Sequence, residues 1–290
     1  AEAKKWVSMA VDAGKGAFGP ESPATDDRAL LELARLVGPL ARDGLGNSQL
    51  AYQIWKDAAG KIKDPQMKAE CEAECADIVI GDALKPDLAR PLLEAASKRL
   101  PERKTGPVAS RLKFVWGDYY AATGDGKAAR KAYHEAEEVL GSTRTHLERT
   151  AWQGAHSRST EDFLKDGDLE RAAAEIHQWL KEFPSEKLDG YVTLLHARYW
   201  AAREMYAQAI ALSEQLLAVA PDSPYADQLL LLAANCEVSR GKIDRAVATL
   251  HSILKDYPGS PLVPVVSDKI KRLESGETPK RKRRPRSKRE

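Results

Sequence analysis

Apolar residues recur at helical spacing along much of this chain. In the segment RAVATLHSILKDYP (245–258), Ala246, Leu250 and Ile253 fall at positions i, i+4 and i+7, so they share one face of a helix. Proline lacks a backbone N–H and restricts the residue before it, so Pro258 is expected to end that helix. The pattern therefore predicts an amphipathic helix followed by a turn.

The same kind of segment occurs several times. An alanine stands twelve residues before a proline in four places, which are Ala89 and Pro101, Ala172 and Pro184, Ala209 and Pro221, and Ala246 and Pro258. Ala129 has the same setting, with Gly141 in place of the proline. Successive alanines are 40, 43, 37 and 37 residues apart. This regularity predicts stacked structural repeats.

Turn sequences divide each repeat into two helices. TGDG (123–126), KDGD (165–168) and SRGK (239–242) lie between the two helices of a pair. Pro-x-Ser-Pro, at 221–224 and 258–261, then separates one pair from the next. Ser223 and Ser260 are the expected N-caps, and Pro224 and Pro261 the expected first helical residues. We expect helix pairs near 27–62, 66–100, 107–140, 144–183, 187–220 and 224–257, and a final capping helix near 262–275.

These repeats resemble the tetratricopeptide repeat (TPR) family. In WGDYYAATGDGKAARKAY (116–133), Trp116-Gly117-x-x-Tyr120 resembles the pattern of the first helix, and Ala129 and Tyr133 that of the second. The resemblance implies an all-α fold, a right-handed α-solenoid of about six antiparallel helix pairs. YPGSP at 257–261 is also similar to junctions in periplasmic TPR proteins of outer-membrane assembly and cell division. The segment 144–164 lacks the Gly-x-x-Tyr pattern.

The sequence suggests four regions. Residues 1–26 are expected to be a flexible leader, with room for one short helix around Trp6. Degenerate helical-hairpin repeats follow at 27–105, and TPR-like repeats with the capping helix at 106–275. Residues 276–290 are expected to be a disordered basic tail, because they cannot bury a core.

Charge is divided unevenly along the 290 residues. The segment 280–290 carries eight basic residues and one acidic residue, so the rest of the chain carries −5 within a net charge of +2. Such a tail could bind polyanions electrostatically. The basic residues are Lys280, Arg281, Lys282, Arg283, Arg284, Arg286, Lys288 and Arg289. No stretch approaches the roughly 20 apolar residues that a transmembrane helix needs.

No motif for catalysis or metal binding emerges. Cys71 and Cys75 lie one helical turn apart, but two soft ligands do not complete a tetrahedral set. The six histidines form no His-Glu-x-x-His motif, and no Gly-x-Ser-x-Gly nucleophile motif is present. The aromatic and basic stretch RLKFVWGDYY (111–120) is more typical of helix packing than of a nucleic-acid platform. We therefore expect no enzyme activity, cofactor or metal.

The resemblance also implies a binding groove. In TPR proteins, first-helix residues beside the packing positions contact the ligand on a concave face. Carried onto this chain, these positions are Arg111, Phe114 and Asp118; Tyr191, Leu194 and Arg198; and Gln228, Leu231 and Asn235. Their mixed polar and apolar character suits a peptide or a partner helix.

The sequence thus favours a non-enzymatic scaffold that binds another protein, expected in the periplasm or envelope of a bacterial cell. Two alternatives remain open. One is a binder of nucleic acid or anionic surfaces through the basic tail, and the other is a regulatory repeat domain of a larger protein. A cytoplasmic location is likewise an alternative to the periplasm.

Overall fold

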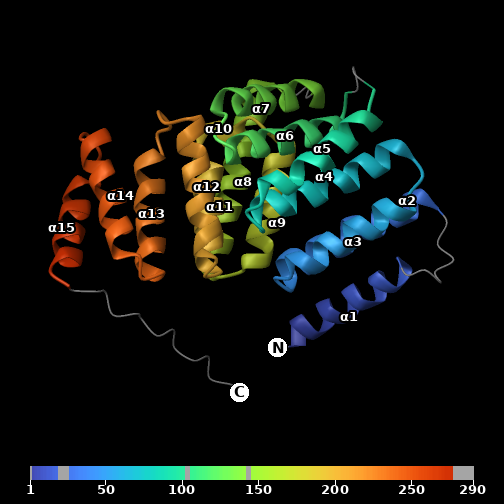
Figure 1. Cartoon of the computed structure of the whole chain (residues 1–290), viewed down its shortest axis with the longest axis horizontal. Coiled ribbons are helices and arrows are strands. Elements are labelled where there is room, and N and C mark those ends of the chain that lie inside the picture. Colours follow the sequence, from blue (N-terminus) through green and yellow to red (C-terminus); the bar gives the residue numbers. More distant parts are fainter. Residues whose placement is uncertain (1, 19–25, 102–104, 142–144, 277–290) are drawn as a thin grey trace. The chain divides into compact units, whose positions relative to one another are not determined.

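A computed structural model describes residues 2–18, 26–101, 105–141 and 145–276, and every regular element in these ranges is a helix (Figure 1). The helices are α1 (Glu2–Ala17), α2 (Asp27–Pro39), α3 (Ser48–Lys61), α4 (Pro65–Gly81), α5 (Pro86–Arg99), α6 (Pro107–Ala122), α7 (Gly126–Leu140), α8 (His146–Asp166), α9 (Leu169–Glu182), α10 (Glu186–Asp189), α11 (Tyr191–Ala202), α12 (Tyr206–Val219), α13 (Ala226–Ser239), α14 (Ile243–Asp256) and α15 (Val263–Glu274). A π-helical turn, η1 (Leu40–Gly44), continues α2. The predicted all-α solenoid of helix pairs is confirmed.

The chain divides into two compact units, residues 1–226 (unit 1) and residues 227–290 (unit 2). The predicted disordered basic tail, 276–290, lies outside the described residues from 277 onward.

The repeat alanines hold the helix pairs together. Ala89, Ala129, Ala172, Ala209 and Ala246 are each 0% exposed. In the pair α6–α7, Gly117 adds a second close approach, because a Cβ at this position would lie 2.5 Å from the Tyr133 ring. Small residues at these positions let one helix lie directly against the next.

Stacking of the pairs changes after α7. The first helices of the second and third pairs, α4 and α6, lie side by side, as expected for neighbouring repeats. Beyond α7, however, α12 packs against α6 and α7, α10 packs against α7, and α9 packs against η1 (Figure 1). Within unit 1 we call α1–α7 the N-terminal block and α8–α12 the C-terminal block. The C-terminal block therefore covers part of the N-terminal block instead of only extending the stack.

Helix α8 accounts for the longest repeat interval. It runs for 21 residues and starts with a capping box, in which Thr145 and Glu148 each bond the other's backbone N–H. Its first turns are poorly covered: Leu147 is 80% and Trp152 49% exposed. These extra turns make the interval between Ala129 and Ala172 43 residues long.

Residues 2–17 of the expected leader form helix α1, which is longer than the one short helix around Trp6 that the sequence allowed there. Val11 is 0% exposed and joins the core formed with α2 and α3. Gly14 lies so close to Val37 that a Cβ would be 2.4 Å from a methyl carbon of that side chain. The many glycines suggested a loose segment, but one of them allows the helix to dock.

The two Pro-x-Ser-Pro turns have the same local geometry. The Tyr225 N–H donates to Ser223 Oγ at 3.3 Å, and the Leu262 N–H donates to Ser260 Oγ at 3.0 Å. Each serine hydroxyl also reaches back about one repeat, donating to the Asp189 carbonyl and to the Asp227 carboxylate. The serines thus stabilise the turn before the helix, and α13 and α15 begin two residues later than expected, at Ala226 and Val263.

Unit 2 has a core of its own. Its described part consists of α13, α14 and α15, and Leu250, Ile253 and Val266 are buried at its centre. The helix α15 covers the apolar face of α14 with Ile270 and Leu273, so the predicted capping role is seen within this unit.

Candidate partner-binding site

The predicted groove residues do not share one accessible surface. On α6, Phe114 is 4% and Asp118 6% exposed, and on α11 Leu194 is 1% exposed. The Arg111 side chain is used inside unit 1, as described below. These four side chains are therefore not available to a ligand in this structure, because the C-terminal block or neighbouring helices already contact them.

The other predicted residues remain partly accessible. Tyr191 and Arg198 on α11 are half-buried and exposed, respectively. On α13, Gln228 and Leu231 are half-buried and Asn235 is exposed. The eight basic residues predicted to bind polyanions, from Lys280 to Arg289, lie outside the described residues.

The side of the N-terminal block that contacts the C-terminal block, called the inner face below, carries a buried charge network. The Arg42 guanidinium of η1 donates to the Asp82 carboxylate at 2.5–3.2 Å and to Asp77 at 2.6 Å. The Arg111 guanidinium binds Glu74 through two bonds of 2.7 and 2.9 Å and lies 3.2 Å from Asp77. Burial acts to raise the pKa of Asp77, but Arg111 and Arg42 outweigh it and hold that pKa well below its usual range.

The C-terminal block adds polar contacts to this face. The Tyr199 hydroxyl donates to Asp43 at 3.1 Å, and the His177 ring lies 3.7 Å from the same carboxylate. The Gln208 amide donates to the Asp82 carbonyl at 2.9 Å. Burial, together with the nearby His177, lowers the pKa of His196 well below its usual value, so this imidazole is neutral at pH 7.

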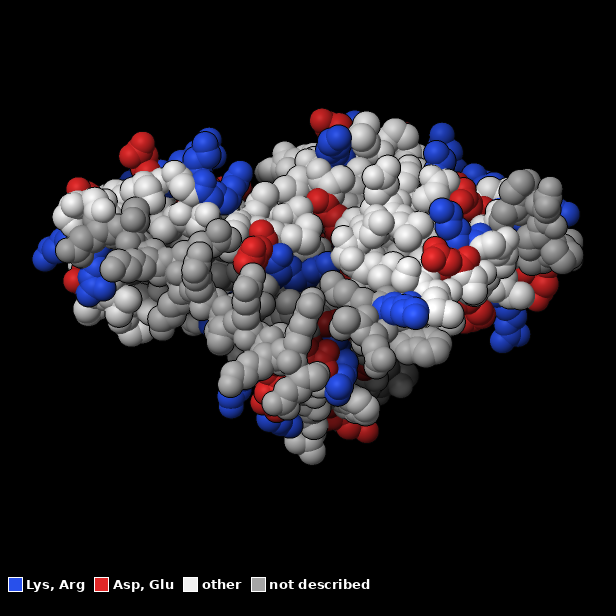
Figure 2. Space-filling view, turned by 90° about the horizontal axis from the view of Figure 1, so that it is seen from below, with Lys and Arg blue, Asp and Glu red and all other residues white. Residues whose placement is uncertain are grey.

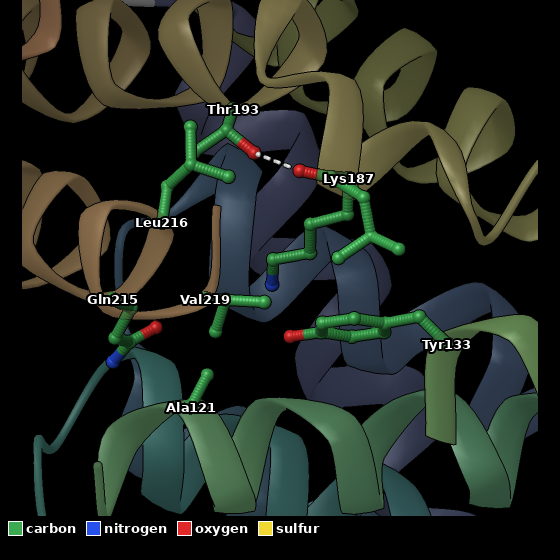
Figure 3. Close-up of a pocket in the computed structure, with 8 residues that line it drawn as sticks. Ala121, Tyr133, Lys187, Thr193, Gln215, Leu216 and Val219 are labelled. Atoms are coloured by element: carbon green, nitrogen blue, oxygen red, sulfur yellow. Dashed lines mark hydrogen bonds between the residues drawn. The ribbon is translucent and has the colours of Figure 1, made fainter. Parts of the chain in front are cut away.

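Lys187 of α10 enters a small pocket between the two blocks (Figure 3). Its ammonium group bonds Asp118, which also accepts a 2.7 Å hydrogen bond from the Tyr133 hydroxyl. The Lys187 nitrogen lies 5.1 Å from the centre of the Phe114 ring and 5.6 Å from that of Tyr133. Burial, and then the Asp118 charge, raise the pKa of Tyr133, so its hydroxyl remains a donor. Sequence reasoning identified Phe114, Asp118 and Tyr133 but missed Lys187, because nothing in the repeat pattern marks a connecting segment.

The Glu137 carboxylate binds the short segment that carries Lys187. Glu137 of α7 accepts hydrogen bonds from the Ser185 N–H at 3.0 Å and from the Ser185 hydroxyl at 2.7 Å. It also pairs with Arg149 of α8. Burial opposes ionisation of Glu137, but these partners lower its pKa overall.

The cysteines have no features of a reactive site. All three are buried and free. Burial raises the pKa of Cys75 to about 12 and that of Cys236 to about 11, so both thiols stay protonated at neutral pH. Within the described ranges, no three His, Cys, Asp or Glu side chains gather in a way that could hold a metal ion.

The surface charge drawn in Figure 2 does not indicate whether a partner would be acidic or basic. On the face drawn in Figure 2, Lys and Arg side chains alternate with Asp and Glu among the coloured residues. Among the described helices, none combines the length and the apolar character needed to cross a membrane.

Comparison with known families adds one match. The tetratricopeptide repeat family matches residues 201–263, a stretch that contains α12, α13 and α14. Comparison with curated proteins gave no match. Repeats of this family generally mediate protein–protein interactions, which is consistent with a scaffold, and all-helical repeats of this kind are typically non-enzymatic.

Proposed function

We propose that this protein is a non-enzymatic scaffold that binds a segment of another protein. The observation that carries the proposal is the accessible face of α13, a first helix within the stretch that matches the TPR family. In that family such helices provide the ligand contacts.

The α13 face has the composition of a peptide-binding surface. Gln228, Leu231 and Asn235 are spaced i, i+3 and i+7, so they form one stripe along the helix. Leu231 is partly buried against the unit 2 core, while Asn235 is exposed. An amide on each side of an apolar residue can bind the backbone and one apolar side chain of an extended peptide.

In unit 1, α11 offers a second proposed surface. Tyr191 packs with its ring centre 4.8 Å from that of Tyr225, and its hydroxyl bonds Glu161. Arg198 lies two turns further along the same helix face and is exposed. Tyrosine and arginine are both enriched in protein interfaces.

A place in a bacterial envelope assembly is the finer part of this proposal. It is supported only by the YPGSP junction at 257–261. Its test is separate from the test of the binding face.

Site-specific photo-crosslinking tests the binding face. A crosslinking amino acid at position 235 should capture a defined partner in cells, whereas the same group at exposed Ala248 of α14 should not. Adding Leu231→Arg to the first variant should abolish capture while the helical circular dichroism signal stays the same. Capture of the same proteins from both positions, or capture that survives Leu231→Arg, would rule out this face.

A further inference from the structure

The inner face of the N-terminal block carries a second possible binding site, distinct from the α11 and α13 faces. We propose that the part of this inner face formed by α6 and α7 is a groove for a polypeptide segment that carries a lysine or arginine, and that residues 184–190 of the same chain occupy it in this structure. Lys187 then stands where the lysine or arginine of a partner would bind. This inference does not depend on the function proposed above, because the two surfaces share no residue.

The connection at 184–190 is bound in the manner of a peptide. It contains only the four-residue helix α10, between Pro184 and Gly190, and Gly190 has φ +93°. Glu137 binds the Ser185 N–H and hydroxyl, and Asp118 binds the Lys187 ammonium. Two carboxylates from neighbouring helices thus recognise a backbone group and a cation two residues later. The ligand class that fits is a segment with Ser or Thr followed, two positions on, by Lys or Arg.

The pocket has the chemistry of a cation site. A carboxylate beneath the ammonium supplies the charge partner, and the Phe114 and Tyr133 rings lie within 6 Å of the nitrogen. The Tyr133 hydroxyl fixes the position of Asp118. These groups belong to α6 and α7, whereas the cation comes from the C-terminal block.

Two contacts that hold the C-terminal block over the N-terminal block are polar and distant in sequence. Gln208 binds the Asp82 carbonyl across 126 residues, and Tyr199 binds Asp43 across 156 residues. In a simple solenoid each repeat contacts only its neighbours. Polar contacts between parts of one chain resemble those of interfaces that open and close. A partner segment would compete with residues 184–190, which have the advantage of a millimolar effective concentration.

Gly126 offers a way to open the groove without altering it. It begins α7, and a Cβ there would lie 2.5 Å from the Ala218 carbonyl oxygen and 3.3 Å from the Val219 Cα. Both neighbours are backbone atoms of the α12 end, so they cannot rotate away. Gly126→Ala should therefore push α12 from α7 while the α7 helix itself is favoured. Gly60→Ala in α3, where a Cβ meets nothing within 4 Å, is the matched control.

The experiment uses the full chain and two readouts. Hydrogen exchange of residues 107–140 should rise on the order of tenfold in Gly126→Ala, but not in Gly60→Ala, while α2 and α3 keep their protection. A labelled peptide PSEKLDGYV, which copies residues 184–192, should then bind Gly126→Ala at least about tenfold more tightly than it binds the unsubstituted protein. The same peptide with methionine in place of lysine should not bind.

Several outcomes would overturn the proposal. One is that hydrogen exchange of residues 107–140 is unchanged in Gly126→Ala. A second is that all of unit 1 loses protection in a single step. A third is that Gly126→Ala binds the lysine and methionine peptides equally. If Gly126→Ala does not fold, Lys187→Met compared with Lys181→Met at an exposed site of α9 gives the same exchange readout. Equal exchange in those two variants would likewise overturn it.

Discussion

At the residue scale, Arg42 shows how a buried charge can be tolerated between helices. Its guanidinium has two carboxylate partners, Asp77 and Asp82, and Asp82 also accepts a 2.5 Å hydrogen bond from the Ser48 hydroxyl. A buried ion pair contributes little over an apolar contact of the same shape, but removing one partner strands the other charge. The network therefore makes these helices depend on one another.

We expect Arg42→Met to destabilise the protein by about 3–5 kcal/mol at pH 7, because Asp82 and Asp77 lose a buried counter-ion. The low pKa of Asp77 contributes stability above the unfolded-state value of about 4, and this contribution is lost as the pH falls towards the folded-state pKa. The loss caused by Arg42→Met should therefore shrink below pH 4. Urea unfolding at pH 7 and pH 3.5 measures both effects.

Arg90→Met is the control for this prediction. Arg90 pairs with Glu94 on the exposed side of α5, so its removal should leave the urea midpoint unchanged. A penalty for Arg42→Met that is equally large at both pH values would contradict the assigned role of Asp77.

At the element scale, local signals were readable from the sequence and long-range ones were not. The burial of Ala209 and Ala246 follows from helical spacing and a proline at a fixed distance, all within about fifteen residues. The burial of Phe114 depends instead on contacts with the C-terminal block such as Lys187, and that of Leu194 on the packing of helices within that block. No periodicity specifies which distant helix will cover a given face, so placing these two residues on first helices did not predict their burial.

Helix α1 is a second element whose docking the sequence concealed. Gly14 and Gly16 indicate a loop by composition, yet the close approach at Gly14 is what brings α1 against Val37. Val11 and Phe18 are buried in the core and Val7 packs against it, so with Gly14 they form a stripe at positions i, i+4, i+7 and i+11. The glycine content concealed this helical spacing.

We expect Val11→Asp to release α1 from the N-terminal block. A carboxylate cannot stay ionised in this apolar site, and the loss of valine burial removes roughly 1.5–3 kcal/mol. Exchange of the backbone amides at 5–17 should rise, while α3 keeps its protection. Ala13→Asp places the same side chain at an exposed position of α1 and should have no such effect. Loss of α3 protection in Val11→Asp would mean that α1 is essential to the whole block.

At the scale of the whole molecule, the two compact units have separate cores. Unit 2 buries Leu250, Ile253 and Val266 among its own three helices, and the charge network around Arg42 belongs entirely to unit 1. In repeat proteins, stability is a sum of repeat terms and nearest-neighbour terms, so a defect in one core spreads only as far as its interfaces transmit it.

Leu250→Ala should therefore unfold unit 2 selectively. Leu250 is fully buried, and the cavity should cost about 2–5 kcal/mol, a large share of what a unit of three helices can supply. Exchange protection should fall across 227–274 and stay unchanged in α4 and α6. Val265→Ala removes apolar atoms from an exposed site of the same unit and should cost less than about 0.5 kcal/mol. If α4 and α6 lose protection together with α13–α15, the two units unfold as one cooperative body. A partner bound to α13 would then also stabilise the inner face of unit 1.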